Sequence, residues 1–197
     1  MRSAFLLALI AALGGCATTS RARQAKSPLE LTLEQARALL GQTALTVKDR
    51  PYRADCSGYV SAAFSAAGVE LIDPAARGMS GTELIYRTLQ IRGRLRGAAR
   101  LRPGDLLFFH NTWDRNGNRL RDDRFTHIAI VDSVESDGTI GFLHFASGRV
   151  KRDLMNVRHP NTPRDPESGK TWNSSLRRGR GRVLAGQLFH RAGRPLP

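Results

Sequence analysis

The chain has 197 residues, enough for one domain of ordinary size with an ordinary hydrophobic core. It contains 31 Lys and Arg residues against 17 Asp and Glu residues, a formal net charge of +14, and only two cysteines. A charge of this size indicates an anionic partner, of which nucleic acid is the first to consider.

The first residues are not expected to belong to the domain. A short basic start, Met1–Ser3, precedes an unbroken apolar run at Ala4–Leu13. Ten apolar residues are too few to span a bilayer as a stable helix, and they suit the apolar region of a signal peptide. Residues 1–15 are therefore predicted to be removed on export.

The sequence Leu13-Gly14-Gly15-Cys16 resembles the lipobox at which bacterial prolipoproteins are lipidated on cysteine and cleaved before it. Cys16 is the predicted lipidation site. Because Ala17 follows it rather than Asp, the resemblance implies a bacterial outer-membrane lipoprotein that faces the periplasm. An ordinary secretory signal, in which Cys16 has no role, is the alternative. Residues 16–28 then form a polar tether, and residues 29–197 form the domain.

Export changes which anionic partners the positively charged protein can meet. Removal of residues 1–15 deletes one charged residue, Arg2, and leaves 14 − 1 = +13. An exported lipoprotein rarely meets nucleic acid, so we expect anionic envelope polymers or membrane headgroups as partners instead. No acidic residue follows Glu167, whereas basic residues stand at Lys170, Arg177, Arg178, Arg180, Arg182, Arg191 and Arg194. This segment is predicted to bind polyanions with salt-sensitive affinity, and a merely solvated basic face is an equally good interpretation.

Three helices are predicted in the first half of the domain. A capping-box pattern that starts at Thr32 predicts a helix over residues 33–40. Asp55 suits the N-cap of a second helix that begins at Cys56. Apolar residues follow there at helical spacing: Cys56, Val60, Ala63, Phe64 and Ala67. A third helix begins at Ser80.

The second half changes to strands. Short apolar runs predict strands over residues 106–109, 127–131, 140–145 and 183–189. Ser136-Asp137-Gly138 supplies a hairpin turn between the second and third of them. Helices followed by antiparallel strands indicate an α+β domain. A long segment over residues 148–182 is predicted to be a substrate-binding insertion or a partly mobile loop.

A second loop, over residues 111–126, carries oxygen ligands at alternate positions. They are Asp114, Asn116, Asn118, Asp122 and Asp123. Calcium loops use such spacing, but Arg119 stands where they place glycine, and four arginines oppose a cation. We therefore favour a polar turn over a calcium site, and we expect no cofactor.

Cys56 is the candidate nucleophile. If Cys16 carries lipid, Cys56 has no disulfide partner, and a lone thiol in an exported protein suggests catalysis. The unpaired N–H groups and the dipole of a helix start favour thiolate over thiol. A buried, inert cysteine is the alternative.

Cysteine catalysis needs a base and a third group that orients the base. His127 opens one predicted strand, and His144 lies on the neighbouring strand of the predicted hairpin. Adjacent strand ends can bring two side chains within hydrogen-bonding reach. Cys56, His127 and His144 then form a consistent triad, although two histidines on strands are more often structural.

Four segments together resemble the ordered motifs of the NlpC-type cell-wall cysteine peptidases. They are Asp55-Cys56-Ser57-Gly58-Tyr59-Val60, Arg102-Pro103-Gly104-Asp105-Leu106-Leu107-Phe108-Phe109, Thr126-His127-Ile128-Ala129-Ile130-Val131 and Leu143-His144-Phe145-Ala146-Ser147. The resemblance covers residues 33–147. It implies a papain-like α+β fold and a triad of Cys56, His127 and His144.

The resemblance also implies a peptidoglycan endopeptidase that cuts the stem peptide between D-glutamate and the diamino acid. Asp55 and Ser57, next to the cysteine, are the expected substrate-binding residues. The tyrosine that the family has about a dozen residues before the cysteine is missing, because Ala44 stands there. Tyr52 either replaces its hydroxyl or is a core aromatic residue.

Two alternatives stay open. A non-catalytic envelope lipoprotein could use the same scaffold and its basic segment to hold wall polymer. A papain-like amidase or acyltransferase could use the same triad on another substrate, because such triads serve several chemistries.

Overall fold

The computed structural model describes residues 25–72, 78–177 and 181–197. The helices in these ranges are α1 (Pro28–Ala38), α2 (Cys56–Ser65), α3 (Gly81–Ile91), the 3₁₀ turn η1 (Ala98–Arg100) and α4 (Ala185–Leu188). The strands are β1 (Leu45–Val47), β2 (Arg50–Tyr52), β3 (Leu95–Arg96), β4 (Leu106–Phe109), β5 (His127–Val134), β6 (Ile140–Ala146), β7 (Arg149–Met155), β8 (Ser175–Arg177), β9 (Val183–Leu184) and β10 (Phe189–Gly193). The predicted signal peptide, Cys16 and most of the tether lie outside the described ranges, as do Arg178 and Arg180.

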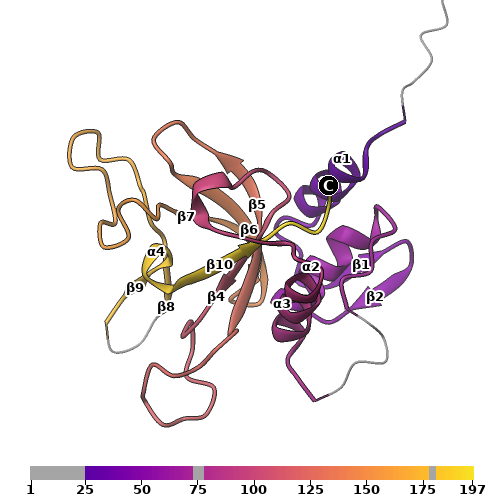
Figure 1. Ribbon diagram of the computed structural model, residues 1–197, viewed down its shortest axis with the longest axis horizontal. Helices are drawn as coiled ribbons and strands as arrows, with labels where there is room; N and C mark the ends of the chain where they lie inside the picture. The colour runs from indigo at the N-terminus through magenta and orange to yellow at the C-terminus, as the bar shows by residue number, and fades with distance from the viewer. Residues whose placement is uncertain (1–24, 73–77, 178–180) are drawn as a thin grey trace, which may run out of the picture.

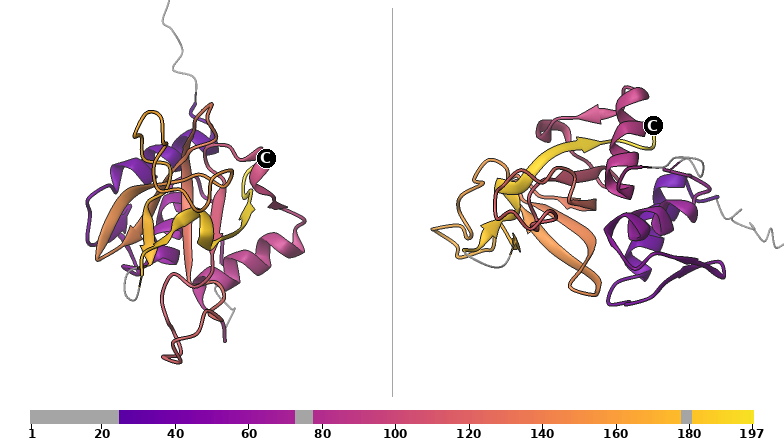
Figure 2. Two further views of the ribbon diagram at one scale, coloured as in Figure 1. Left: turned by 90° about the vertical axis from the view of Figure 1, so that its left-hand side faces the viewer. Right: turned by 90° about the horizontal axis from the view of Figure 1, so that it is seen from below.

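A six-stranded antiparallel sheet with the order β3-β10-β4-β5-β6-β7 forms the centre of the domain. Helix α2 packs against β5 and β6, and α1 and α3 pack against α2. Figure 1 shows α1, α2 and α3 on one side and α4 with β8 and β9 on the other, and the views in Figure 2 agree. The predicted α+β arrangement is confirmed.

Both faces of the sheet are covered by apolar side chains. Phe108, Ile128 and Ile130 belong to the core shared with the helices, whereas Leu107 and Phe109 belong to a second core on the other face. Strand β4 is therefore buried at all four positions. This explains why its sequence is a continuous apolar run rather than an alternating one.

The first helix begins earlier than predicted. Ser27 is its N-cap: the Ser27 hydroxyl accepts from the Glu30 N–H (3.2 Å), and the Glu30 carboxylate accepts from the Ser27 N–H (2.7 Å). Thr32, the predicted cap, lies inside the helix and donates to the Pro28 carbonyl. Pro28 at the first helical position lacks an N–H that would be unpaired anyway, so the earlier start costs little.

Two predictions for the second half were wrong. Residues 148–182 are not one loop, because they contain β7 and β8. Residues 183–189 are not one strand, because α4 separates β9 from β10. The Gln187 side chain accepts from the Leu184 N–H (2.9 Å) and closes a turn there. An apolar run cannot reveal such a side-chain turn.

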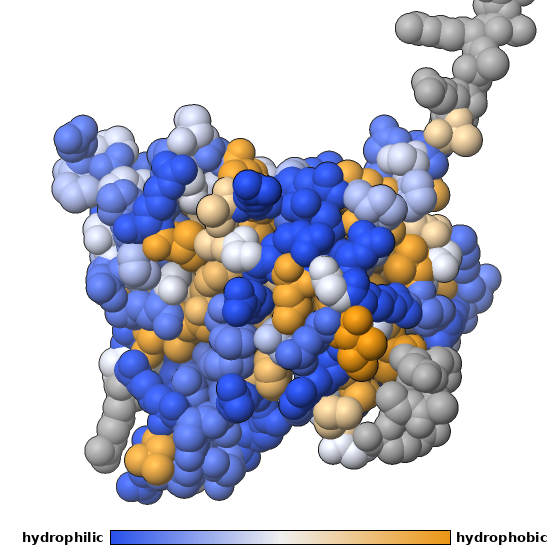
Figure 3. Space-filling model, viewed as in Figure 1, coloured by the Kyte–Doolittle hydropathy of each residue, from blue (hydrophilic) through white to orange (hydrophobic). Residues whose placement is uncertain are grey.

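The face shown in Figure 3 is mostly hydrophilic, and its apolar areas are small and separated. Among the described residues, the large apolar side chains that are exposed include Trp113, Leu120 and Ile91. Isolated exposures of this kind need no partner to explain them. No helix within the described ranges is both long enough and apolar enough to span a membrane.

A buried ion pair ties the C-terminal segment to the start of β4. Asp105 is 1% exposed and accepts two bonds from the Arg194 guanidinium, both 2.8 Å long. The Asp105 carboxylate also accepts from the backbone N–H of Arg102 (3.1 Å). Arg194 therefore has a structural role and is not free for a polyanion.

We predict that Arg194→Ala lowers the free energy of unfolding by about 3 kcal/mol, because it leaves the buried Asp105 carboxylate without its counter-charge. Urea denaturation followed by circular dichroism measures the change. Arg87→Ala is the control, since it removes an exposed pair with Glu83 and should cost less than about 1 kcal/mol. Equal losses in the two variants would contradict the assignment.

Candidate active site

Cys56 is the first residue of α2, as predicted. Its neighbour Asp55 is the N-cap, and one Asp55 oxygen accepts from the Gly58 N–H (2.7 Å) and from the Ser57 hydroxyl (2.8 Å). The other oxygen pairs with Arg53 (3.0 Å). Asp55 and Ser57, predicted to bind substrate, thus also build the helix start that presents the thiol.

Two glycines let backbone and side chains approach this helix start closely. A Cβ on Gly58 would lie 2.0 Å from the Arg53 carbonyl oxygen, and a Cβ on Gly81 would lie 2.4 Å from the Ser57 hydroxyl. Only glycine fits at these two positions without displacing the neighbours. Close packing therefore explains the glycine at position 58, in addition to its place in the sequence motif around Cys56.

His127 and His144 are brought together as predicted. His127 Nε2 lies 2.7 Å from His144 Nδ1, and both rings are almost fully buried. His127 begins β5, where it pairs with Phe109 of β4, and His144 lies on the neighbouring strand β6. The two strands and the core residue Phe109 fix the position of both rings.

Cys56 lies next to the start of β5, the strand that carries His127, but does not bond to the histidine pair. The Cys56 sulfur is 3.7 Å from the Thr82 hydroxyl, and the backbone of Ile128, the residue after His127, lies near enough to lower the pKa of the thiol. Among the described residues, no hydrogen bond joins Cys56 to His127. Thr82 is thus a neighbour of the thiol that the sequence did not point out. Catalytic hydrogen bonds are often long or misaligned before substrate binds.

Burial favours the neutral form of both the Cys56 thiol and the His127 imidazole. Burial raises the pKa of the Cys56 thiol above its ordinary value, although the Thr82 hydrogen bond opposes this effect. Burial also lowers the pKa of His127 well below its ordinary value, with His144 adding to the shift. The helix start is expected to favour the thiolate, whereas desolvation favours the neutral thiol and is the largest cause of the raised pKa of Cys56.

A cavity of about 320 Å³ opens on Cys56. Ser57, Thr82 and Thr126 line it, together with Arg53 and Asp55 at one end and Trp113, Arg115 and Phe125 of the loop over residues 111–126. This loop is irregular, as predicted, and it supplies a large aromatic side chain and a cation to the cysteine cavity. Those two contributions were not foreseen.

Tyr52 does not line the cysteine cavity. It is half-buried against the helical core and borders a neighbouring cavity of about 490 Å³, which shares Arg53, Ser57 and Gly81 with the first. The Arg50 guanidinium lies over its ring, 5.0 Å from the centroid. Both interpretations of Tyr52, as a core aromatic residue and as a substrate contact, are compatible with this position.

The calcium-loop candidate forms a self-bonded turn. The side-chain oxygens of Asn116 and Asn118 accept from backbone N–H groups of the loop, and their amides donate to Asp122. Asp114 accepts from the Arg119 N–H (2.8 Å), and Arg119 has the positive φ of 66° that the expected glycine would have. No group of three or more His, Cys, Asp or Glu side chains in the described ranges could hold a metal ion.

Asp153 was missed by sequence reasoning. It lies on β7, and its Oδ2 is 3.0 Å from His144 Nε2 and 2.8 Å from the Lys151 ammonium. The signal was the dipeptide Ser147-Gly148, both with positive φ, which forms the tight turn between β6 and β7. A hairpin there would have placed Asp153 next to His144.

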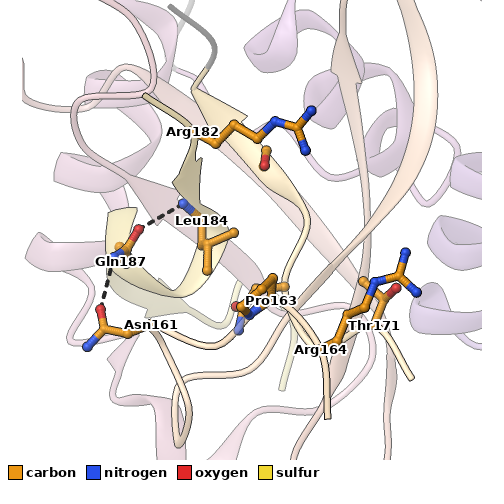
Figure 4. A pocket seen from close by; sticks show the side chains of 9 residues that line it. Asn161, Pro163, Arg164, Thr171, Arg182, Leu184 and Gln187 are labelled. Carbon is orange, nitrogen blue, oxygen red and sulfur yellow. Dashed lines mark hydrogen bonds between the residues drawn. The ribbon is translucent and has the colours of Figure 1, made fainter. Parts of the chain in front are cut away.

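In the described part of the basic C-terminal segment, the basic side chains have different surroundings. Lys170 pairs with Glu135 and Asp137, and Arg177 donates to the Asn111 carbonyl. Arg182 lines a separate cavity of about 440 Å³ with Asn161, Pro163, Arg164, Thr171, Asn173, Ser175, Leu184 and Gln187. Figure 4 shows this cavity, in which Gln187 bonds both Leu184 and Asn161.

The neutral thiol and imidazole predict a pH dependence. Alkylation of Cys56 by iodoacetamide should rise with pH and level off only above the ordinary pKa of a cysteine, because burial penalises the charged thiolate. The rate is measured by mass spectrometry of the tryptic peptide of residues 54–77, which separates Cys56 from Cys16. A plateau that begins below pH 6 would show a thiolate–imidazolium pair and contradict the prediction.

A model of the NlpC/P60 family matches residues 42–163, more than half of the chain, and the match includes Cys56, His127 and His144. No significant match is found among curated proteins or among solved structures. The helices packed on an antiparallel sheet, with the cysteine at a helix start, agree with the papain-like fold expected from the sequence. The chain therefore belongs to the NlpC/P60 family, whose members are generally cysteine peptidases that act on the cell wall.

Proposed function

We propose that this protein is a lipid-anchored peptidoglycan hydrolase of the bacterial cell envelope that cuts the stem peptide between D-glutamate and the diamino acid. The observation that carries the proposal is the thiol of Cys56, at the start of α2, in a cavity bordered by the residues that lead into the His127–His144 pair. Membership of the NlpC/P60 family supplies the substrate class.

The reaction begins when Cys56 turns from Thr82 towards His127. His127 takes the thiol proton while the sulfur attacks the amide carbonyl carbon, and the carbonyl oxygen becomes an oxyanion. The backbone N–H of Cys56, unpaired at the helix start, donates to that oxygen. The C–N bond then breaks, and the imidazolium of His127 protonates the leaving amine.

The second half of the reaction hydrolyses the thioester. His127, again neutral, takes a proton from water as the water oxygen attacks the acyl carbon. The carbon–sulfur bond breaks, Cys56 recovers its proton from His127, and the new carboxylic acid leaves. The two neutral partners suit this cycle, because each proton transfer is then coupled to attack or departure rather than completed beforehand.

The walls of the cavity support a substrate that carries carboxylates. Arg53 and Arg115 stand at the cysteine cavity, and Trp113 is 53% exposed beside them. A stem peptide cut after D-glutamate has carboxylates near the scissile bond, and guanidinium groups bind carboxylates in two parallel hydrogen bonds. Arg53 already pairs with Asp55, so Arg115 is the cation that we assign to the substrate.

Anchoring through a lipid on Cys16, at the periplasmic face of the outer membrane, completes the proposal. The cavity lined by Arg164 and Arg182, without a carboxylate among its lining residues, supports an additional contact with anionic wall polymer. This same observation favours the second candidate function, a non-catalytic protein that holds the wall.

Digestion of purified sacculi by the full-length protein tests the activity. We expect the wild type to release soluble fragments, and mass spectrometry of these fragments to show cleavage after D-glutamate. Cys56→Ala and His127→Ala should release none, because each removes one partner of the proton transfer.

Arg87→Ala is the matched control, since its side chain lies in an exposed pair with Glu83 away from the cavity. It should digest sacculi like the wild type. If the wild type sediments with sacculi but releases no more than Cys56→Ala, the wall-holding function replaces the hydrolase. Fragments joined to a new acyl acceptor would indicate acyl transfer.

A further inference from the structure

Three consecutive strands carry three polar side chains that are linked in a row by hydrogen bonds. His127 lies on β5, His144 on β6 and Asp153 on β7, and the two links measure 2.7 Å and 3.0 Å. His144 is fully buried, and the Asp153 side chain is 15% exposed. Nothing in the reaction described above needs Asp153, so its buried contact with His144 calls for a separate explanation.

The register of β7 accounts for the position of Asp153. His144 pairs with Lys151 across the β6–β7 hairpin, and Phe142 pairs with Asp153. Side chains two residues apart on a strand share a face, so Lys151 and Asp153 flank His144 on its own side of the sheet. Arg152, between them, projects to the opposite face and pairs there with Asp132.

The carboxylate remains ionised in this place. Burial raises the pKa of Asp153, but the hydrogen bonds from His144 and Lys151 outweigh that effect and bring the pKa below its ordinary value. Both bonds end on the same oxygen, Oδ2. An ionised carboxylate only accepts hydrogen bonds, so His144 must carry its proton on Nε2.

This proton sets the tautomer of the next ring. With a proton on Nε2, neutral His144 has a lone pair on Nδ1 and accepts the bond between the rings. The proton of that bond therefore belongs to Nε2 of His127. Nδ1 of His127 is left with a lone pair, which is what a base for the Cys56 thiol requires.

We propose that Asp153 is a positioning residue that fixes the proton order of both histidines and so keeps Nδ1 of His127 free to accept the Cys56 proton. This inference rests on the proposed function only in taking His127 as the base for Cys56. Lys151 supports Asp153 by holding the same carboxylate oxygen. The catalytic apparatus thus extends one strand beyond the predicted triad.

The asparagine variant separates this role from simple packing. Asp153→Asn keeps the size of the side chain, but it has a single acceptor oxygen. Because Lys151 only donates, it binds the amide oxygen, which leaves the amide nitrogen to donate to His144 Nε2. His144 would then carry its proton on Nδ1 and donate to His127 Nε2, which places the His127 proton on Nδ1 and removes the lone pair there. In serine proteases, the same Asp-to-Asn change at the acid that contacts the catalytic histidine lowers kcat about 10⁴-fold.

The test measures alkylation of Cys56 in the full-length protein, which needs no substrate. At pH 7 we expect Asp153→Asn to slow alkylation of the peptide of residues 54–77 at least about tenfold, because the base has lost its lone pair. Above the pKa of the thiol the two rates should converge, since a thiolate needs no base. The wild type and the variant share the other charged groups near these side chains, which are Asp55 near Cys56 and Lys151 near residue 153.

Arg152→Gln is the matched control, because it removes an ion pair from the same strand without touching the histidines. In this variant, Cys56 should be alkylated at the wild-type rate at every pH. Nitrogen-15 NMR of the histidine rings reports the tautomers directly: His127 and His144 should both carry Nε2 protons in the wild type and Nδ1 protons in Asp153→Asn.

Each outcome decides one question. Unchanged tautomers and unchanged alkylation in Asp153→Asn would overturn the positioning role. A loss that is equal at every pH, or that Arg152→Gln reproduces, would also overturn it, because it would reflect general disruption of β7. If the alkylation difference appears as expected while sacculi stay intact, the positioning role stands and only the proposed substrate fails.

Discussion

The active site depends on one packing arrangement, the start of α2 held against the first residues of β5. Asp55 caps the helix, Gly58 admits the Arg53 carbonyl, and the apolar side of α2 packs on Ile128 and Ile130. Because the cap, the close approach and the burial all act at the same turn, the Cys56 sulfur has little freedom except to rotate. The two histidines belong to a sheet that is packed on both faces.

Burial in this arrangement determines the chemistry as well as the geometry. The dipole of a helix start and its free N–H groups favour a thiolate, whereas desolvation of the same sulfur is the largest cause that raises the pKa of Cys56. The imidazole of His127 is buried too, and its pKa moves in the other direction. A neutral pair of this kind needs a lone pair on His127 that accepts the thiol proton, and the proposed proton order along His144 and Asp153 supplies it.

The sequence alone located the candidate nucleophile, both histidines, two of the three predicted helix starts and the strands that carry the candidate site. These features follow from local signals: caps, apolar periodicity and turn residues. It failed where the decisive contact lay far along the chain or depended on a side chain. Ser27 and Thr32 both suit a helix N-cap, and Ser27 is the one used. The turn closed by Gln187 interrupts an apolar run, and β7 lies in a segment whose many charged and proline residues did not indicate a strand. Asp153 could be predicted only by extending the chain from β6 through a hairpin turn at Ser147-Gly148. The positions of Trp113 and Arg115 at the cavity could not be predicted, because they depend on the path of an irregular loop.

The central claim is that the Cys56 sulfur attacks an amide carbonyl of the wall peptide. The most direct measurement is acid quenching of the full-length enzyme during digestion of purified muropeptides, followed by mass spectrometry of the tryptic peptides. We predict that the peptide of residues 54–77 gains the mass of the acyl part of the substrate, and that this adduct disappears when the reaction is allowed to finish. Digestion without any adduct on this peptide, or with the adduct on another residue, would contradict the assignment of Cys56 as the nucleophile.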